Sequence, residues 1–245
     1  TQLASASWDG TARVWDVAAS AAGETPDPIV LTGHTDRIWK LDFSADGSRL
    51  ATGSADGTAR IWDIQSGEPV LTITGHGGRI QALDWSFDGR RLATGGAGGN
   101  VMVWDLTTTV TTIDQAELSI PVDSFIYDVV FSPDGSRLAI GKEEGPTTVW
   151  DVSSVEGGRV FDLASQRSST TAVSFSPDGR QLATAGFDSS VKVWDMTRKG
   201  QELLTLAAHT DAAIGVAFSP DGGQLASASF DGTARVYILD VDELI

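Results

Sequence analysis

The sequence predicts an all-β repeat protein whose four-stranded antiparallel sheets stand around a common axis. Its first indication is a Trp-Asp dipeptide that recurs at steps of 47, 42, 46, 44 and 43 residues, counted to a Tyr in the sixth copy. The aromatic residues at these places are Trp15, Trp62, Trp104, Trp150, Trp194 and Tyr237. Between turn sequences the segments are short and rich in Val, Ile, Thr and Trp, which is typical of strands. Four strands per period of this length are typical of blades around an axis.

Two turns divide each copy. The first contains Asp-Gly, which supplies the positive φ of a tight hairpin turn. It reads FSADG at 43–47, WSFDG at 85–89 and FSPDG at 131–135, 175–179 and 218–222. Strand-length segments lie between the turns, for example RIWKLDF at 37–43 and RLATGS at 49–54. No segment has a sustained helical period, and only DVDELI at 240–245 is expected to start a helix.

The two end copies are expected to be incomplete. The chain begins with a second strand in TQLASAS, and its last copy has no outer strand after TARVYIL. We therefore expect about 22 strands in six copies. The parent protein is expected to continue upstream, with a seven-bladed ring favoured and a six-bladed ring with a flawed seam as the alternative. Residues 18–28 are interpreted as a polar insertion inside the first copy.

Residues 33–64, GHTDRIWKLDFSADGSRLATGSADGTARIWDI, resemble a WD repeat from its Gly-His to its Trp-Asp. Six copies in register extend the resemblance over the chain, which is expected to be a single WD-repeat β-propeller domain over 1–245. The repeats end near 17, 64, 106, 152, 196 and 239. The ending DGTARVYILDVDELI resembles the C-terminal propellers of bacterial multidomain signalling proteins, in which a STAND-type NTPase or a Ser/Thr kinase precedes the repeats.

The resemblance implies a buried polar network of His, Ser or Thr, Asp and Trp in each copy. Such a network fixes one geometry when every member is satisfied. The second copy has all four residues, His34, Thr52, Asp56 and Trp62. The third copy has His76, Thr94 and Trp104, but Gly98 stands in the Asp position. The sixth copy has His209, Ser227 and Asp231, and Tyr237 stands in the Trp position. The fifth copy has Thr184, Asp188 and Trp194 without a His, and the fourth keeps only Trp150, with Ile140 and Glu144 in the polar positions. The fourth blade is therefore expected to be the most distorted.

No catalytic or metal-binding residues and no cofactor are predicted. All three His occupy the same network position, and the chain has no Cys for a thiol nucleophile or a Cys-based zinc site. The repeated Asp are distributed one per blade, whereas acid–base catalysis needs groups that converge on one pocket. The Gly residues fall in hairpin turns, and no phosphate-binding loop precedes a helix. An enzyme would require a polar cluster at the central channel, which the sequence does not indicate.

Charge disfavours nucleic acid and membrane surfaces as partners. The formal net charge is −16, so the chain repels phosphate backbones and anionic lipids. The N-terminal TQLASASWDG has no features of a signal peptide, and no apolar stretch approaches the length that spans a membrane. These features favour a cytoplasmic location.

The resemblance places partner-binding residues on one rim face of the ring, in two register positions. One position precedes the turn Asp and the other lies four residues before the Phe of FS. The large apolar residues there are Trp8, Trp39, Tyr127, Phe187, Ile214 and Phe230. Aromatic anchors with a polar rim are typical of protein interfaces, and acidic surroundings favour a basic peptide.

Three alternatives remain at this point. These side chains could merely pack between neighbouring blades. The domain could act as a structural or autoinhibitory clamp on an upstream effector of the same chain. It could also be assembled from designed repeats, although the unequal copies argue against that.

Overall fold

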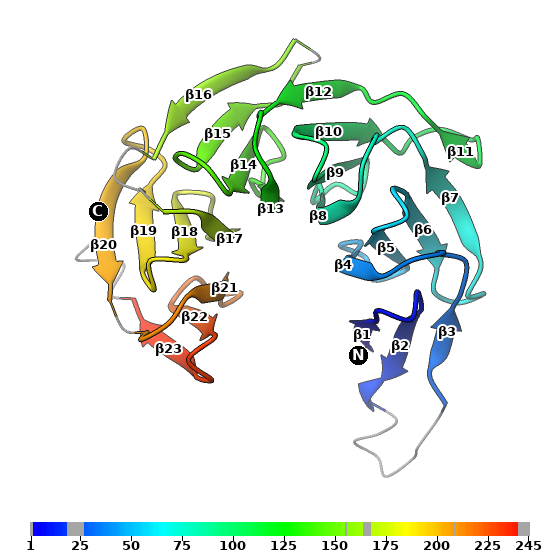
Figure 1. Cartoon of the computed structure of the whole chain (residues 1–245), viewed down its shortest axis with the longest axis horizontal. Helices are drawn as coiled ribbons and strands as arrows, with labels where there is room; N and C mark the ends of the chain where they lie inside the picture. Colours follow the sequence, from blue (N-terminus) through cyan, green and yellow to red (C-terminus); the bar gives the residue numbers. More distant parts are fainter. Residues whose placement is uncertain (1, 19–26, 155, 164–167, 208, 240–245) are drawn as a thin grey trace. The chain divides into compact units, whose positions relative to one another are not determined.

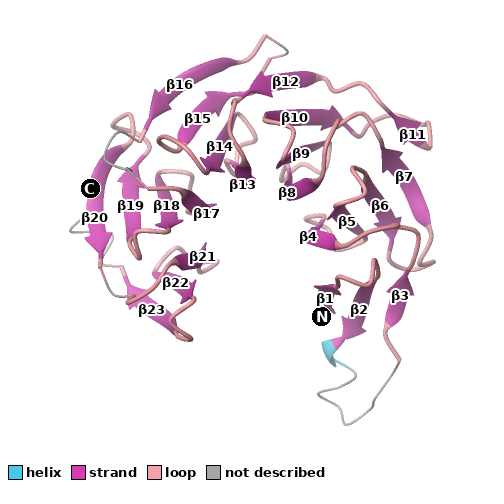
Figure 2. Cartoon of the chain, viewed as in Figure 1, coloured by secondary structure: helices cyan, strands magenta, loops and turns pink. Residues whose placement is uncertain are grey.

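The computed structural model describes residues 2–18, 27–154, 156–163, 168–207 and 209–239, and within them the fold is almost entirely β (Figure 2). The chain divides into two compact units, Thr1–Pro121 and Val122–Ile245, which are described separately. Each unit contains three sheets, and these sheets are the blades of a β-propeller fold. The expected helix at 240–245 lies outside the described residues. No helix in the described ranges is long and apolar enough to cross a membrane.

The first unit contains the sheets of the first three copies (Figure 1). The first sheet consists of β1 (Gln2–Ala6), β2 (Ala12–Asp16) and β3 (Ile29–Leu31). The second contains β4 (Ile38–Phe43), β5 (Arg49–Ser54), β6 (Ala59–Asp63), β7 (Pro69–Ile73) and the short β11 (Thr112–Ile113). The third contains β8 (Ile80–Trp85), β9 (Arg91–Gly96), β10 (Asn100–Asp105) and β12 (Leu118–Pro121).

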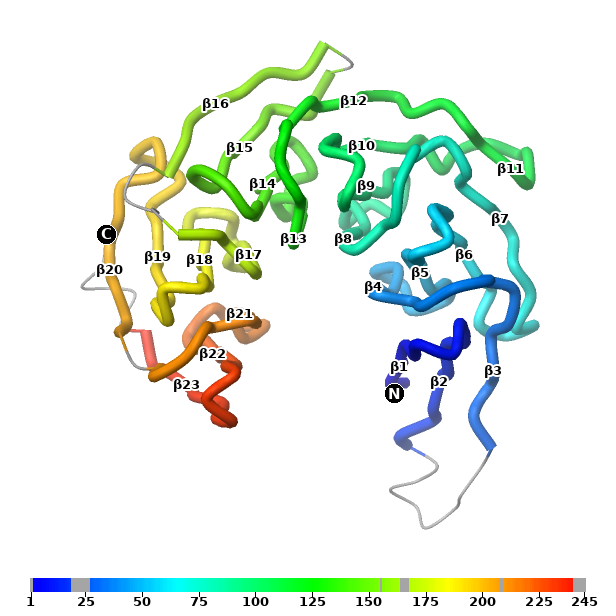
Figure 3. The backbone as a smooth tube through the Cα atoms, in the orientation of Figure 1, coloured from blue at the N-terminus to red at the C-terminus, as the bar shows by residue number. Residues whose placement is uncertain are grey.

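The second unit contains the fourth, fifth and sixth sheets along the chain. The fourth sheet consists of β13 (Ile126–Phe131), β14 (Arg137–Lys142), β15 (Thr148–Asp151) and β16 (Gly158–Asp162). The fifth contains β17 (Thr170–Phe175), β18 (Gln181–Gly186), β19 (Val191–Asp195) and β20 (Gln201–Leu206). The sixth contains β21 (Ala213–Phe218), β22 (Gln224–Ser229) and β23 (Ala234–Ile238). The backbone trace in Figure 3 follows these strands in chain order.

The hairpin turn between the first two strands of a copy is built by a fixed set of local bonds. In the second copy the Gly47 amide donates to the Ser44 carbonyl at 2.8 Å, and Gly47 has a φ of 69°. The Ser44 hydroxyl donates to Asp46 at 2.7 Å and receives the Arg49 amide at 3.0 Å. The positive φ explains why Gly ends the turn, and the side-chain bonds explain the Ser and Asp before it.

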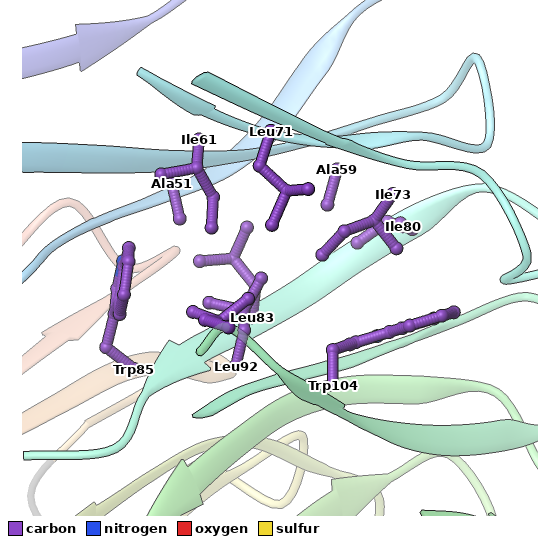
Figure 4. Packing of buried hydrophobic residues seen from close by; sticks show 11 residues of the cluster. Ala51, Ala59, Ile61, Leu71, Ile73, Ile80, Leu83, Trp85, Leu92 and Trp104 are labelled. Carbon is purple, nitrogen blue, oxygen red and sulfur yellow. The ribbon is translucent and has the colours of Figure 1, made fainter. Parts of the chain in front are cut away.

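Apolar side chains from neighbouring sheets pack together inside each unit. In the first unit Ile61, Leu71 and Ile73 of the second sheet pack against Ile80 and Leu83 of the third (Figure 4). Strands buried on both faces read as near-continuous apolar runs rather than as a strict alternation. In β9, RLATGG, five of six residues are buried, so both faces of this strand are covered although its sequence is rich in small residues.

The fourth blade is not the most distorted sheet, contrary to the expectation. Its four strands pair in the same antiparallel order as those of the fifth sheet, and its inner hairpin has the same register shift, between Ile126 and Asp128, that the fifth has between Thr170 and Ala172. The buried Ile140 replaces a polar network residue without disturbing the pairing. The unusual pairing lies in the preceding segment, where β11 pairs in parallel with β7 of the second sheet while β12 completes the third.

The end sheets have three strands each within the described residues, as the sequence predicts. Among residues 2–239, as far as they are described, no strand of the first sheet precedes β1 and none of the sixth follows β23. The structure therefore has 23 described strands rather than about 22, because residues 112–113 form the additional β11. That all six copies form one domain stays a prediction.

Candidate functional site

A hydrogen-bond relay crosses the second sheet and links the four residues that the resemblance assigns to its network. The Trp62 indole donates to the Thr52 hydroxyl at 2.9 Å, and Thr52 Oγ1 lies 2.8 Å from His34 Nε2. His34 Nδ1 lies 2.9 Å from Asp56 Oδ2. Because an ionised carboxylate only accepts, Nδ1 carries the proton and Nε2 accepts from Thr52. The relay thus holds one tautomer of a neutral imidazole.

Protonation in this relay is set by burial and hydrogen bonding. Burial lowers the pKa of His34, and the neighbouring Asp56 only partly opposes that effect. Burial alone would raise the pKa of Asp56, but hydrogen bonds from Thr58, Thr35 and His34 outweigh it and lower the pKa to about 2. At neutral pH the pair is therefore a neutral His34 that is hydrogen-bonded to an ionised Asp56, and this bond holds the two residues in one geometry.

The sixth sheet repeats the relay with two changes. His209 Nε2 lies 2.8 Å from the Ser227 hydroxyl, and His209 Nδ1 lies 3.0 Å from Asp231. Ser227 replaces Thr, and its hydroxyl lies 3.5 Å from the Tyr237 hydroxyl that stands in the Trp position. In the fifth sheet the Trp194 indole donates to the Thr184 hydroxyl at 2.9 Å.

The third sheet has an incomplete relay. The Trp104 indole donates to Thr94 at 2.8 Å, but neither ring nitrogen of the buried His76 has a side-chain or other standard hydrogen-bond partner. Gly98 supplies no carboxylate, and a methyl group placed on it would lie 3.9 Å from His76 Nδ1. Burial lowers the pKa of His76, and the nearby backbone groups of Gly78 and Thr94 only partly oppose that effect without making a hydrogen bond of good geometry to the ring. This His is therefore buried in the network position of its copy.

The fourth sheet has a different polar arrangement. The Trp150 indole donates to Thr148 at 3.1 Å, and Thr147 shares a hydrogen bond of 2.8 Å with Thr170 of the fifth sheet. No group of three or more His, Cys, Asp or Glu side chains in the described ranges is arranged to hold a metal ion.

The first aromatic cluster consists of Trp8, Arg37 and Trp39, and is called the Trp8 cluster. The pairing of Ile38 with Ser54 places the start of β4 at the same end of the second sheet as the turn after β5. Trp8 and Trp39 lie with ring centroids 5.7 Å apart, and the Arg37 guanidinium stands 4.5 Å from the Trp8 ring. Trp8 is 66% exposed, so this cluster is an aromatic surface that already carries one cation.

The second aromatic cluster consists of Phe125, Tyr127 and Phe187, and is called the Tyr127 cluster. Tyr127 lies between the other two rings, with centroid distances of 5.0 Å to Phe125 and 5.7 Å to Phe187. The Glu143 amide donates to the Phe125 carbonyl at 2.9 Å, which places this exposed carboxylate residue beside the rings. Burial and the charge of Glu143 both raise the pKa of the Tyr127 hydroxyl.

The six residues predicted for partner binding thus fall into three groups. Trp8 and Trp39 form one, Tyr127 and Phe187 another, and the exposed Ile214 and Phe230 belong to the sixth sheet.

Sequence reasoning missed Arg37 and Phe125. Both stand two residues before the predicted strand position, at Trp39 and Tyr127. Both residues precede their strands, and the pairing shifts register between Ile38 and Lys40 and between Ile126 and Asp128. Strand alternation therefore does not predict their place, and only the ring contacts reveal it.

Comparison with protein families gave five matching segments. Residues 1–16, 28–63, 67–105, 157–195 and 200–237 match the WD40 family, described as "WD domain, G-beta repeat", and together they cover more than half of the chain. The fourth copy, which has the fewest network residues, lies mostly outside these segments. No curated protein matched the chain.

Proposed function

Because the chain belongs to the WD40 family, whose propeller domains generally act as protein-interaction scaffolds, we propose that it is a non-catalytic domain that binds a basic peptide segment of a partner protein on the rim face. WD40 domains typically bind proteins or peptides, and the family is generally non-catalytic. One observation carries the finer proposal. The Tyr127 cluster combines three contacting rings with the adjacent carboxylate of Glu143.

This combination favours a Lys or Arg side chain of the partner. A cation over an aromatic face is attracted by the ring quadrupole, by about 0.5–1 kcal/mol at an exposed site. Glu143 adds an opposite charge at the same place, and Phe187 is 44% exposed and accessible to a partner. In the Trp8 cluster Arg37 already occupies the ring face, so we assign the basic side chain to the Tyr127 cluster.

A titration with short peptides tests this proposal. A blocked Gly-Arg-Gly-Lys-Gly peptide is titrated by NMR into the folded chain, and the same peptide with both cations changed to Glu serves as the comparison. We expect the basic peptide to shift the resonances of Tyr127 and Phe187 and the acidic peptide to leave them unchanged. Equal binding of the two peptides would contradict the proposal.

Matched variants locate the charge contribution. Glu143→Gln removes the carboxylate beside the rings, and Glu156→Gln removes an exposed carboxylate elsewhere in the same unit. We expect the first to weaken the basic peptide by about 2–5-fold and the second to have no effect. Phe187→Ala should weaken it by a similar factor through loss of a ring.

The clamp alternative predicts a different partner. If the domain holds an upstream effector of its own parent chain, the upstream region should bind and a variant with Trp8, Trp39 and Phe230 changed to Glu should lose it. Our proposal also includes a cytoplasmic, bacterial signalling context, supported by the resemblance of residues 231–245 and by the absence of Cys.

A further inference from the structure

The first and the sixth sheets are built from nearly the same sequence, LASASWDGTARVW at 3–15 and LASASFDGTARVY at 225–237. Each sequence forms two antiparallel strands, β1 with β2 and β22 with β23, in the same register. Ala4 pairs with Val14 in the first sheet as Ala226 pairs with Val236 in the sixth. Since side chains alternate along a strand, equivalent residues of the two sheets lie on equivalent faces.

The contact between the first and second sheets shows what covers one of these faces. The first sheet contributes Ala12 and Val14, which are buried, with Ala4 packed beside them. The residues of the second sheet in the same buried cluster include Leu50, Trp62 and Ile64. One half of this contact is therefore formed by two Ala and a Val, and the other half by Leu, Trp and Ile.

The sixth sheet has the Ala, Ala and Val half of this contact uncovered. Ala226, Ala234 and Val236 stand at the three equivalent positions and are of the same residue types. All three are exposed. The strand residues that share this face carry no charge, and they are Gln224, Ala226, Ala228, Ala234, Val236 and Ile238.

The first sheet has the Leu, Trp and Ile half uncovered on its other face. Leu3, Trp15 and Val17 stand at the positions of the Leu, Trp and Ile in the second sheet, and all three are exposed. The Trp15 indole donates to the Ser5 hydroxyl at 3.2 Å. Burial of this ring therefore leaves no unpaired indole donor, which would be unfavourable.

The charge next to Trp15 is compatible with packing. Arg13 lies on the same strand face as Trp15, and its guanidinium is 3.8 Å from the carboxylate of Asp9. The equivalent Arg60 of the second sheet lies 5.9 Å from the ring of Trp62, which is fully buried in its contact with the first sheet. The net charge of −16 on each chain opposes association at long range, and salt screens this repulsion.

We propose that the exposed face of the sixth sheet packs on the exposed face of the first sheet in a second copy of this chain, as the first sheet packs on the second. Five of the six residues compared are identical to those of the contact inside the first unit, and the sixth is Val17 in place of Ile64. The contact joins two different faces and is heterologous, so each pair of chains keeps one free face of each kind. Association therefore extends beyond a dimer, and it is independent of peptide binding at the Tyr127 cluster.

Sedimentation velocity of the whole chain tests the proposal. The chain is measured from micromolar to near-millimolar concentration at about 0.15 M salt, where the Debye length of about 8 Å limits the long-range repulsion. We expect the weight-average sedimentation coefficient to rise with concentration and species larger than a dimer to form at the upper end. A chain that stays monomeric over the whole range would overturn the proposal.

Two variants, studied alone and mixed, identify the faces. Val236→Lys blocks the face of the sixth sheet, and Leu3→Lys blocks that of the first. Each variant alone should be monomeric, because it keeps only one of the two faces that a contact needs. An equimolar mixture should form a dimer and stop there, because one intact face of each kind remains. Association of either variant alone, as in a symmetric dimer, or no dimer in the mixture would contradict the proposal.

Val160→Lys is the matched control. Val160 in β16 is exposed and lies outside both faces, so this variant adds the same charge elsewhere. It should associate as the unchanged chain does. Circular dichroism and urea unfolding establish that all three variants are folded, which is expected because the substituted side chains are exposed. Loss of association in Val160→Lys would show that charge rather than the two faces controls it, and would overturn the proposal.

Discussion

The relay from Trp62 to Asp56 and its broken counterpart at His76 differ by one side chain. In the second sheet the carboxylate of Asp56 accepts from His34 Nδ1 at 2.9 Å, and in the third Gly98 stands in its place. Gly98 is not among the residues with positive φ, so its backbone accepts a side chain without strain. A substitution of Gly98 could therefore supply the carboxylate that the network of the third copy lacks.

Gly98→Asp should stabilise the chain. A carboxylate beside His76 gives the buried imidazole a hydrogen-bond partner, which is worth about 1 kcal/mol. The measurement is the midpoint and free energy of urea unfolding. Gly98→Ala is the matched control, because it reports the backbone effect of losing Gly, about 0.4–1 kcal/mol. Our interpretation fails if the Asp variant is no more stable than the Ala variant.

Acid should destabilise the protein in two steps. The pKa values of His34 and His76 are lowered from 6.5 by burial, so their contribution is complete above pH 6.5 and is lost as the pH falls below it. The pKa of Asp56 is lowered from 3.8 to about 2, so its contribution is lost between these two values. Urea unfolding at pH 8, 6, 5, 4 and 3 measures both steps. His76→Phe should reduce the slope between pH 7 and pH 5, and an unchanged slope would contradict the assignment to His76.

At the scale of elements, β11 joins the connection between β10 and β12 to a neighbouring sheet. Both of these strands belong to the third sheet, but β11 pairs with β7 of the second. The Thr72 amide donates to the Thr111 carbonyl at 2.9 Å and the Thr74 amide to the Ile113 carbonyl at 3.0 Å. Gly75 permits this approach, because a methyl group on it would lie 1.9 Å from the Asp114 carbonyl oxygen. The short strand thus depends on one glycine in the neighbouring copy.

Gly75→Ala should detach β11. The clash with the Asp114 carbonyl forces one segment to move, at a cost of about 1–3 kcal/mol. Amide hydrogen exchange measures the result: protection of Thr72 and Thr74 should fall while that of β8 and β9 stays. Gly158→Ala is a suitable control, because nothing described lies within 4 Å of a methyl group there and its φ is not positive. Retained protection at Thr72 and Thr74 would show that the segment tolerates the methyl group.

Most of the strands could be predicted from the sequence, since the repeat supplies six versions of the same signals. β11 could not, because two residues that pair with a different copy have no local pattern. The Tyr127 cluster was only partly predictable. Its Tyr127 and Phe187 stand in family positions, whereas Phe125 falls outside them and becomes apparent only through ring contact. The exposed faces of the end sheets needed the structure too, because the exposure of Leu3 and Val236 depends on which sheets cover them.

At the scale of the whole molecule, the three-stranded end sheets expose faces that other copies bury. Val236 in β23 is 66% exposed, whereas the equivalent Val193 in β19 is fully buried. Leu3 in β1 is 58% exposed, and the equivalent Leu50 in β5 is fully buried. Exposed apolar faces and strand edges promote association between chains.

The same substitution at these two equivalent positions should therefore affect different properties: the stability of the fold at Val193 and the self-association of the chain at Val236. Val193→Thr buries a hydroxyl and should lower the free energy of unfolding by about 1–3 kcal/mol. Val236→Thr should change it by less than about 0.5 kcal/mol and should reduce self-association. Urea unfolding measures the first effect, and sedimentation velocity at several protein concentrations measures the second. Equal destabilisation by the two variants would show that the Val236 face is covered in solution.

The parallel pairing of β11 with β7 also affects how the first unit comes apart. The segment from β10 to β12 belongs to the third sheet, yet its middle is hydrogen-bonded to the outer edge of the second. Unfolding of either sheet therefore breaks the hydrogen bonds between β11 and β7 that join it to the other sheet. Repeat proteins can lose their units one by one at the ends. Here the second and third sheets are expected to open together as one foldon, so the first unit has fewer cooperative steps than it has blades.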